Sequence, residues 1–498
     1  MSMGRKTSSQ PPLWVPHTAV AAAPGHTFYE KLNELLGRHG FDAHVEGLCE
    51  GFYGSDEKQG RRSIPPGVYF RMLLIGYFEG IESERGICWR CADSLSLRGF
   101  LGLELTDTVP DHSSLSRIRK RLATKVYDEV FRYILSIVEK EGLLKGRVVG
   151  VDSTYLRADA SMKAIVRRET GEKYAEYLKG LAKAAGIENP TEEDGRRLDR
   201  NRKKRKTSNT EWASTTDSDA RITRLKDGRT RLAYKPEHVV DLETGAILAA
   251  DVHPADKADP TTIAETMESA RANVLAATEI SESSERDDDD DDTPSGAGDG
   301  SGRQVVEVVG DKGYHSARVI TELESRGFRP YIPERKQRGK RRWKDKGGRA
   351  TALAVYRNRL RCARAKSKAL HRRRGELVER PFALLCETGA ARRTRLRGRE
   401  NVAKRYKVHV AAANLGLIMR TLLGVGSPRR YWDALRRAAA AAAVFVIVVT
   451  GFEAARVVVR RWIAAANRLW GAWHQRLRRA MAPTAVLASR ELQFSTGC

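Results

Sequence analysis

The pattern of apolar and polar positions predicts a chain that begins with helices. Between residues 27 and 98, apolar side chains recur at helical spacing, and Pro65 and Pro66 precede an apolar body at 69–78. Because proline is tolerated in the first turn of a helix, this arrangement predicts a helix that starts at the proline pair. A further short helix is predicted at 88–101.

A long amphipathic helix is predicted from about 114 to 141. Its apolar positions keep a helical period, and Gly142 follows its last turn. Its first half carries four basic side chains, Arg117, Arg119, Lys120 and Arg121. A basic helix of this kind favours contact with a DNA backbone, and a solvated helix face explains the same residues equally well.

Two short apolar runs each lead to an aspartate. The run 148–151 is followed by Asp152, and the run 305–309 is followed by Gly310 and Asp311. A continuous apolar run closed by a polar residue is typical of a strand that is buried on both faces. A single aspartate at a strand end is commonly a turn or cap residue. Two such aspartates favour a pair of carboxylates fixed at the edge of one sheet.

The remaining pattern completes an α/β fold, with a mixed sheet flanked by helices. Strands at 230–240 and 246–252, joined by a turn at 242–245, predict a hairpin in which Gly245 takes positive φ. Further helices are expected at 260–275, 316–326, 352–385 and 404–423, and a short strand is expected at 330–333.

Three stretches interrupt this core. The charged segment 158–225 is predicted to be a mostly helical insertion, and 334–349 is predicted to be a flexible basic loop. The segment 281–303 contains six consecutive aspartates followed by Thr, Ser and Gly. Because dense like charge cannot form a core, this acidic insert is expected to be disordered, with no part in metal binding.

The net positive charge of the chain indicates what kind of molecule it binds. The chain has 498 residues, with 89 Lys and Arg against 63 Asp and Glu, for a net charge of +26. Such an excess favours a polyanion, nucleic acid first, although a basic binder without chemistry would share it. The six cysteines form no disulfide framework, and the lone pair Cys88 and Cys91 has no second pair to complete a zinc site.

A membrane location is not expected. The most apolar stretch, 438–452, is shorter than the ~20 residues of a spanning helix, and arginines flank it. It is interpreted as a buried or self-associating helix. The polar N-terminus shows no signal peptide pattern, so the expected location is cytoplasmic and nucleoid-associated.

The candidate chemistry rests on three acids. Asp152 and Asp311 end two strands, and Glu379 lies on a predicted helix. Converging carboxylates in this order suit two hard divalent cations that assist phosphoryl transfer. His253, Asp256 and Asp259 also look like a ligand set, but they follow a strand in a loop with Pro254 and Pro260. We interpret that loop as structural, with a secondary substrate contact as the alternative.

Several stretches resemble bacterial insertion-sequence transposases of the DDE class, which have a ribonuclease H-like catalytic domain and an N-terminal helical domain. The resemblance runs from about 28 to 420. It is carried by SIPPGVYFRMLLIGYFEG (63–80), VPDHSSLSRIRKRL (109–122), GVDSTYL (150–156), the segment 227–259, VVGDKGYHS (308–316) and the segment 373–420, which includes VERPF (378–382).

The resemblance implies roles by position. Asp152 and Asp311 match the two metal-binding aspartates, and Glu379 matches the glutamate. Tyr314 matches the aromatic residue after the second aspartate. The family often places Tyr, Arg and Lys around its glutamate, where this chain has Arg372, Gly375 and Cys386. Arg373 and Arg374 could take the arginine role, and Glu376 is the alternative acid.

The implied function is transposition. The expected cofactor is a pair of Mg²⁺ ions, with Mn²⁺ as a substitute. The expected partners are the terminal inverted repeats of an element and the target DNA, bound by a homodimer or higher oligomer. The candidate DNA-binding residues are Arg117, Arg119, Lys120, Arg121, Tyr314, Lys340, Arg341, Arg342, Trp343, Arg373 and Arg374. Alternatives are a decayed or domesticated DNA-binding regulator, and a metal-dependent nuclease without strand transfer.

The expected domains follow from these assignments. They are a disordered N-terminus at 1–26, a helical DNA-binding domain at 27–145, a ribonuclease H-like catalytic domain at 146–425 with the insertion 158–225 and the acidic insert 281–303, and a basic, Ala-rich helical tail at 426–498.

Overall fold

A computed structural model of the chain describes residues 25–53, 63–202, 208–225, 227–286, 305–335 and 348–480. Two compact units are present, Met1–Pro428 and Arg429–Cys498. Several predictions fall outside the described residues: those for the first 24 residues, for the six aspartates, and for Lys340, Arg341, Arg342 and Trp343.

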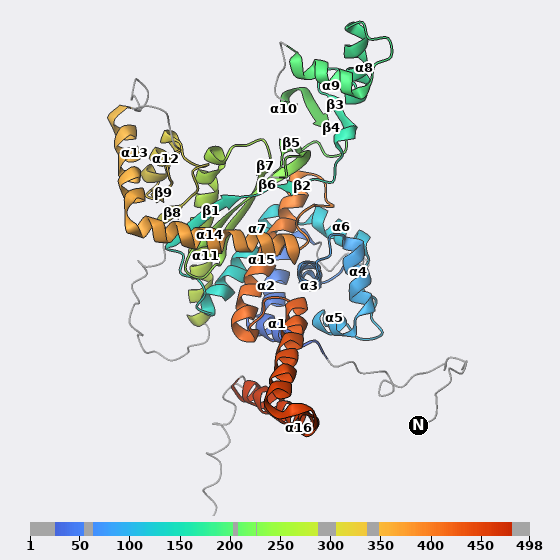
Figure 1. Cartoon of the computed structure of the whole chain (residues 1–498), viewed down its shortest axis with the longest axis vertical. Helices are drawn as coiled ribbons and strands as arrows, with labels where there is room; N and C mark the ends of the chain where they lie inside the picture. The colour runs from blue at the N-terminus through green and yellow to red at the C-terminus, as the bar shows by residue number, and fades with distance from the viewer. Residues whose placement is uncertain are drawn as a thin grey trace, which may run out of the picture. The chain divides into compact units, whose positions relative to one another are not determined.

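A mixed seven-stranded sheet lies at the centre of the first unit, which confirms the predicted α/β class (Figure 1). Strand β1 pairs antiparallel with β6 on one side and parallel with β8 on the other. The strands are β1 (Val148–Ser153), β2 (Leu156–Arg157), β5 (Arg221–Arg224), β6 (Thr230–Asp241), β7 (Ile247–Pro254), β8 (Glu307–Val309) and β9 (Arg329–Tyr331). The predicted hairpin is confirmed as β6 and β7, and Gly245 has φ 84°.

Helices cover both faces of this sheet. Helices α14 (Ala365–Glu387) and α15 (Arg399–Leu423) lie on the face to which His238 points, where its ring stacks on Phe382 and contacts Tyr406. Helix α11 (Asp259–Arg286) lies on the opposite face, where Thr262 and Thr266 bond Glu237. Because β1 is covered on both faces, Val149 and Val151 have no exposed surface.

The N-terminal part is helical, as predicted. Its helices are α1 (Thr27–Arg38), α2 (Phe41–Cys49), α3 (Pro66–Phe78), α4 (Glu84–Asp93), α5 (Leu95–Phe100), α6 (His112–Arg121) and α7 (Thr124–Lys140). Helix α15 packs against α7, α3 and β7, so the helical part and the sheet share one core.

Two of the predicted N-terminal helices are each divided in two. The helix expected at 114–141 breaks into α6 and α7, because Leu122 and Ala123 both take extended backbone angles and Leu122 is fully buried. The helix expected at 88–101 breaks at Ser94, whose hydroxyl accepts a hydrogen bond from the backbone N–H of Leu97 and thereby caps α5.

The insertion at 158–225 is not mostly helical, so that prediction was wrong. It holds the helices α8 (Tyr174–Ala184), α9 (Glu192–Asn201) and α10 (Ser208–Glu211), but β3 (Ile165–Arg167) pairs with β4 (Trp212–Ser214) beneath them. Trp212 packs edge-on against Tyr174 and Tyr177, and these rings join the ladder to the hydrophobic core of the first unit.

Later predictions hold with shifted boundaries. Helix α11 continues to Arg286, so the acidic insert begins later than the expected residue 281. Helix α12 (Ala317–Ser325) and strand β9 are found where they were predicted. The helical region 352–385 consists of α13 (Gly348–Ala363) and α14, separated at Arg364, which takes extended angles.

The tail forms α16 (Pro428–Ala480), as its composition predicted. By length and composition alone, one stretch of the described residues, Arg399–Ala442, is apolar enough to cross a membrane. Its first part is α15, which packs inside the core of the first unit, and more than half of its most apolar window is buried.

Candidate active site

Asp152 and Asp311 stand at the carboxyl ends of two adjacent parallel strands. In the register of β1 and β8, Gly150 lies opposite Val309. Continuing that register by two residues brings Asp152 opposite Asp311. Neighbouring strands lie about 4.8 Å apart, and residues in register point to the same face. The parallel register therefore directs two acids that are far apart in sequence to the same edge of the sheet.

Helix α14 crosses the sheet next to these acids. One guanidinium nitrogen of Arg374 lies 3.0 Å from Oδ2 of Asp152, and its Nε donates a hydrogen bond to the carbonyl of Val151 at 3.1 Å. The helix approaches closely because residue 150 is glycine. A Cβ there would lie 2.5 Å from Cγ2 of Val378.

Glu379 lies on the exposed side of α14. Val378 faces Gly150 of β1, and Leu377 approaches Gly245, which lies in the turn at the Val148 end of β1. Successive helical residues are about 100° apart, so Glu379 points to the side opposite Leu377. Glu376 points away from the sheet and pairs with Arg380 at 3.0 Å.

His371 completes the face of α14 toward the aspartates. It lies one helical turn before Arg374, on the same side of the helix. Burial lowers the pKa of the His371 imidazole, the charge of Arg374 lowers it further, and the charge of Asp311 opposes this. Because its pKa is lowered, the His371 imidazole is mostly neutral at neutral pH.

A tight turn fixes Asp311. The backbone N–H of Gly313 donates to its Oδ1 at 2.6 Å. A Cβ on residue 313 would lie 2.7 Å from that oxygen and 3.2 Å from Oδ2 of Asp259. A side chain at residue 313 would therefore displace the Asp311 carboxylate, and Asp259 stands beside Asp311 as a third acid at this edge.

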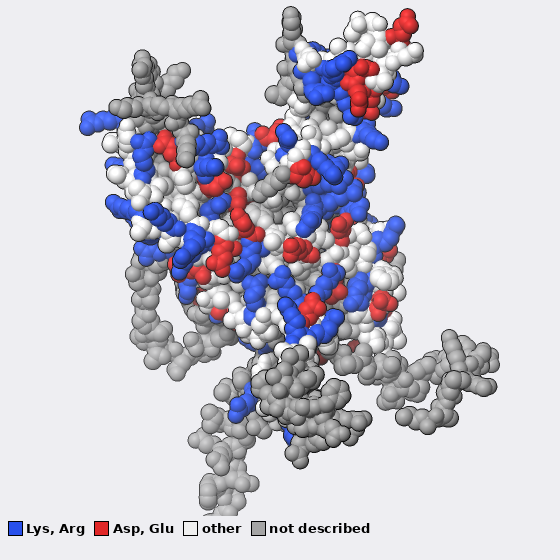
Figure 2. All heavy atoms as spheres, viewed as in Figure 1, with Lys and Arg blue, Asp and Glu red and all other residues white. Residues whose placement is uncertain are grey.

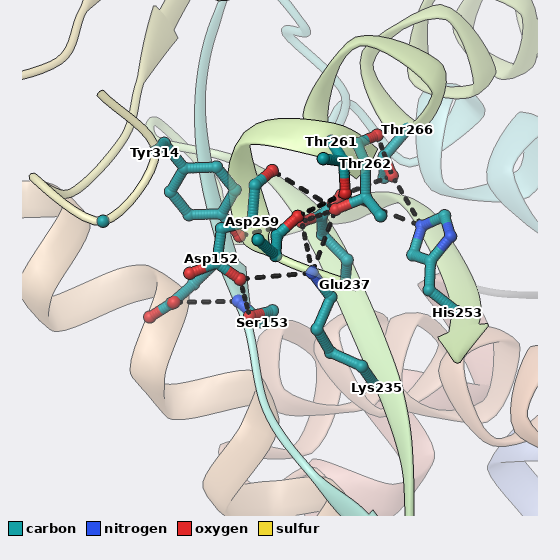
Figure 3. Close-up of polar contacts among 12 residues, drawn as sticks. Asp152, Ser153, Lys235, Glu237, His253, Asp259, Thr261, Thr262, Thr266 and Tyr314 are labelled. Atoms are coloured by element: carbon teal, nitrogen blue, oxygen red, sulfur yellow. Dashed lines mark hydrogen bonds and ion pairs between the residues drawn. The ribbon is translucent and has the colours of Figure 1, made fainter. Parts of the chain in front are cut away.

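Asp259 belongs to the site, although the sequence favoured a purely structural loop for it. Its Oδ1 accepts a hydrogen bond from the hydroxyl of Ser153 at 2.9 Å and lies 3.2 Å from the ammonium of Lys235 (Figure 3). Lys235 is only 1% exposed and also donates to Thr262. A buried ammonium thus holds the first residue of α11 against the end of β1.

The two other residues of that loop do not join Asp259. His253 contacts Thr266 at 3.2 Å, and Asp256 lies 3.8 Å from Arg221. The ligand set that the spacing suggested is therefore not formed. The sequence signal for Asp259 is Lys235. Residues two apart on a strand share a face, so Lys235 and Glu237 of β6 point to the same side, where a buried lysine needs an acidic partner.

A buried carboxylate lies behind the site. Glu237 has no exposed surface and accepts hydrogen bonds from Tyr314, Thr262 and Thr266 (Figure 3). Burial raises the pKa of Glu237 to about 7, against the opposing effect of these hydroxyls and of Lys235. The Tyr314 hydroxyl ties the turn after Asp311 to β6, so this tyrosine is a structural tether.

Burial separates the predicted DNA-binding residues into two groups. Arg117, Lys120, Arg121 and Arg373 are exposed. Arg119 is buried in an ion pair with Glu84, and Tyr314 has no exposed surface. The expectation that Arg119 and Tyr314 contact DNA is therefore not supported, and Arg374 faces Asp152 from a mostly buried position.

Among the residues that the structure describes, no further ligand joins the cysteine pair in a metal-binding group. Cys88 and Cys91 are free thiols on α4, and burial raises the pKa of Cys88 to about 11 and that of Cys91 to about 12. They remain protonated at neutral pH, which agrees with the structural role that their isolated spacing indicated.

The carboxylates suit a hard divalent cation by their chemistry. Asp152, Asp311 and Glu379 offer only oxygen donors, the ligands that Mg²⁺ prefers. Among the described residues, no three acidic, histidine or cysteine side chains converge closely enough to hold a metal ion. In this conformation Arg374 and Lys235 supply the positive charge at the acids.

Comparison with known proteins points to one kind of protein. A family model described as a transposase domain matches residues 18–121. A second, described as a transposase DDE domain, matches residues 213–415, which include β6, β7, Asp311 and Glu379. No curated protein and no solved structure matches the chain.

Proposed function

Because this chain belongs to the insertion-sequence DDE transposases, with a helical N-terminal domain and a ribonuclease H-like catalytic domain, we propose that it binds the ends of its element and catalyses Mg²⁺-dependent strand cleavage and transfer to target DNA. The observation that carries this proposal is the parallel register of β1 and β8, which leads toward Asp152 and Asp311, together with the contact of Arg374 of α14 with Asp152.

The residues have distinct roles in this proposal. Asp152, Asp311 and Glu379 would hold two Mg²⁺ ions, which when bound supply Lewis acidity and lower the pKa of attacking water. Arg374 balances the charge of Asp152 in the free protein and lies where a DNA phosphate would enter. Arg373, exposed on the outer side of α14, neutralises backbone phosphate.

Lys235, Ser153 and Asp259 act as positioning residues. Their contacts fix the first turn of α11 against the end of β1, next to Asp152. Catalytic ligands must be held within fractions of an ångström, and buried contacts of this kind provide that rigidity. The set therefore supports the proposed chemistry without touching the reacting atoms.

The proposal is tested with labelled duplex DNA that carries the sequences flanking the gene. The wild-type protein with Mg²⁺ should nick the duplex at the element end and join the freed 3′-OH to a target plasmid. Asp152→Asn should abolish nicking and keep DNA binding. The matched control is Asp256→Asn, which removes an aspartate outside the site and should nick normally.

Other outcomes select other functions. Binding without nicking in Mg²⁺ or Mn²⁺ would identify a DNA-binding regulator, and nicking without joined products would identify a nuclease. Sedimentation of the protein with end DNA tests the proposed homodimer or higher oligomer. Imaging of a tagged protein tests the proposed location on the nucleoid in the cytoplasm.

A further inference from the structure

Four arginines from three separate segments meet beside the sheet. They are Arg157 of β2, Arg231 of β6, and Arg393 and Arg395 of the segment between α14 and α15; we call them the arginine cluster. None was singled out by the sequence, because each stands alone in its segment or among other basic residues.

Backbone pairing brings the segments together. On one side of β2, Arg157 pairs with Ala233 of β6. On the other side, the N–H of Arg157 donates to the carbonyl of Arg392 at 3.2 Å, and the N–H of Thr394 donates to the carbonyl of Arg157 at 2.8 Å. Strand β2 therefore lies between β6 and the segment after α14.

Strand geometry turns these side chains to one face. Arg231 stands two residues before Ala233, so it is the diagonal neighbour of Arg157 on the same face. Arg393 is bridged directly to Arg157, and Arg395 follows it by two residues. Figure 2 shows Lys and Arg side chains gathered where Figure 1 places β2, β5 and the segment after α14.

The positive charge of the cluster is only partly balanced. Arg393 pairs with Asp159 at 2.8 Å, and Arg395 pairs with Glu82 at 2.8 Å. In the part of the chain that the structure describes, Arg157 and Arg231 form no ion pair. Desolvation lowers the pKa of Arg157, the charges of Arg231, Arg393 and Arg395 lower it further, and the charge of Asp227 opposes them. The protein thus concentrates repelling cations at a partly exposed face, which a bound polyanion would relieve.

The cluster continues the strands of the active site. In the register of β1 and β6, Asp152 lies opposite His238, which follows Arg231 by seven residues, about 23 Å along the strand. Arg157 follows Asp152 on the next strand segment of the chain. At a rise of about 3.4 Å for each base pair, this separation corresponds to about seven base pairs.

We propose that the arginine cluster binds backbone phosphates of duplex DNA about seven base pairs from the scissile bond, independently of base sequence. This rests on the proposed function for the location of the scissile bond. Guanidinium groups pair with phosphate oxygens through two parallel hydrogen bonds, which fixes register as well as charge. The large exposed apolar side chains of the described residues lie outside these segments, which favours duplex over single strands held by base stacking.

The test measures binding to a duplex of arbitrary sequence over a range of salt concentrations, with Ca²⁺ in place of Mg²⁺. The double variant Arg157→Gln with Arg231→Gln should bind about tenfold more weakly. Its slope of log affinity against log salt should be shallower by about two units, because each lost phosphate contact removes about 0.9. Arg157→Lys with Arg231→Lys should keep the wild-type slope.

The matched control is Arg38→Gln with Arg147→Gln. It removes two exposed arginines, of which Arg147 precedes β1 at the end opposite Asp152. A cluster variant with the affinity and slope of this control would overturn the proposal. Thermal melting of all variants excludes unfolding as the cause of a change.

The outcome is separable from that of the proposed function. A wild-type protein that never nicks DNA, but loses salt-dependent binding in the cluster variant, would contradict the proposed reaction and support the binding surface. A wild-type protein that nicks and joins DNA while the cluster variant binds like the control would support the reaction and overturn the binding surface.

Discussion

The guanidinium of Arg374 lies 3.0 Å from the carboxylate of Asp152. The Arg374 side chain is 11% exposed and that of Asp152 is 23% exposed, so water screens this pair only in part. The same carboxylate accepts a hydrogen bond from its neighbouring N–H on Ser153. In the free protein, a cation of the chain therefore occupies the place where a metal ion would meet Asp152, and metal binding must compete with it.

Replacing Arg374 should make metal binding easier. In Arg374→Gln the positive charge at Asp152 is removed, and the Mg²⁺ concentration for half-saturation should fall about fivefold, equivalent to about 1 kcal/mol for a partly exposed pair. Titration calorimetry without DNA measures this. Arg373→Gln is the control, since Arg373 is exposed on the next position of the helix. Equal Mg²⁺ affinities in all three proteins would contradict the competition.

Glu379 should be the third catalytic carboxylate. Glu379→Gln should reduce end cleavage by at least about 100-fold, because changes one shell further from a metal already cost ~10–100-fold. Glu376→Gln removes an exposed acid on the other side of α14 and should cut within about twofold of the wild type. Single-turnover cleavage at saturating DNA is the measurement. If Glu376→Gln reduced cleavage more than Glu379→Gln, Glu376 would be the third catalytic carboxylate.

The hydroxyl of Tyr314 should couple the Asp311 turn to the sheet. Tyr314→Phe removes a hydrogen bond to buried Glu237, and we expect a loss of about 1–3 kcal/mol in the free energy of unfolding. Cleavage should also slow, because the turn that holds Asp311 loses its tether to β6.

A second tyrosine provides the comparison. Tyr331→Phe removes a similar hydrogen bond to Glu307, in the parallel part of the same sheet. It should lower stability and leave the cleavage rate near that of the wild type. Chemical denaturation and single-turnover rates are compared for both variants. If Tyr331→Phe slowed cleavage as much as Tyr314→Phe, general destabilisation would explain the effect.

Glu237 should make stability depend on pH. Burial raises its pKa from 4.5 to about 7, so the folded protein keeps a proton that the unfolded chain releases. Stability from this group is therefore lost as pH rises from about 4.5 to about 7, by about 3 kcal/mol in all, and is constant above. Denaturation at several pH values measures the loss.

The isosteric variant isolates this effect. Glu237→Gln does not titrate, so the difference in unfolding free energy between variant and wild type should shift in favour of the variant as pH rises through the same window. Other titrating groups are common to both proteins and cancel in the difference. Parallel stability profiles for the two proteins would show that Glu237 is ionised throughout.

The sequence alone determined the features that depend on local pattern. Apolar runs closed by Asp152 and Asp311 identified the two central strands, because a strand buried on both faces has apolar side chains at every position. The turn at Gly245, the helix start at Pro66 and the helix end before Gly142 followed from short-range chemistry. The amino-acid sequences of whole segments indicated the family, and the two matching family models confirmed it.

Only the tertiary structure decided what depends on neighbours far apart in the chain. The break at Leu122 and the β3–β4 ladder reflect burial against other elements, which overrides helical periodicity. Asp259 lies at the site because its carboxylate pairs with the buried ammonium of Lys235. Arg119 and Tyr314 are buried, not exposed, because Glu84 and Glu237 provide partners for their polar groups. The arginine cluster forms because β2 pairs with β6 on one side and with the segment after α14 on the other. The spacing of these residues along the chain does not predict that the three segments are neighbours.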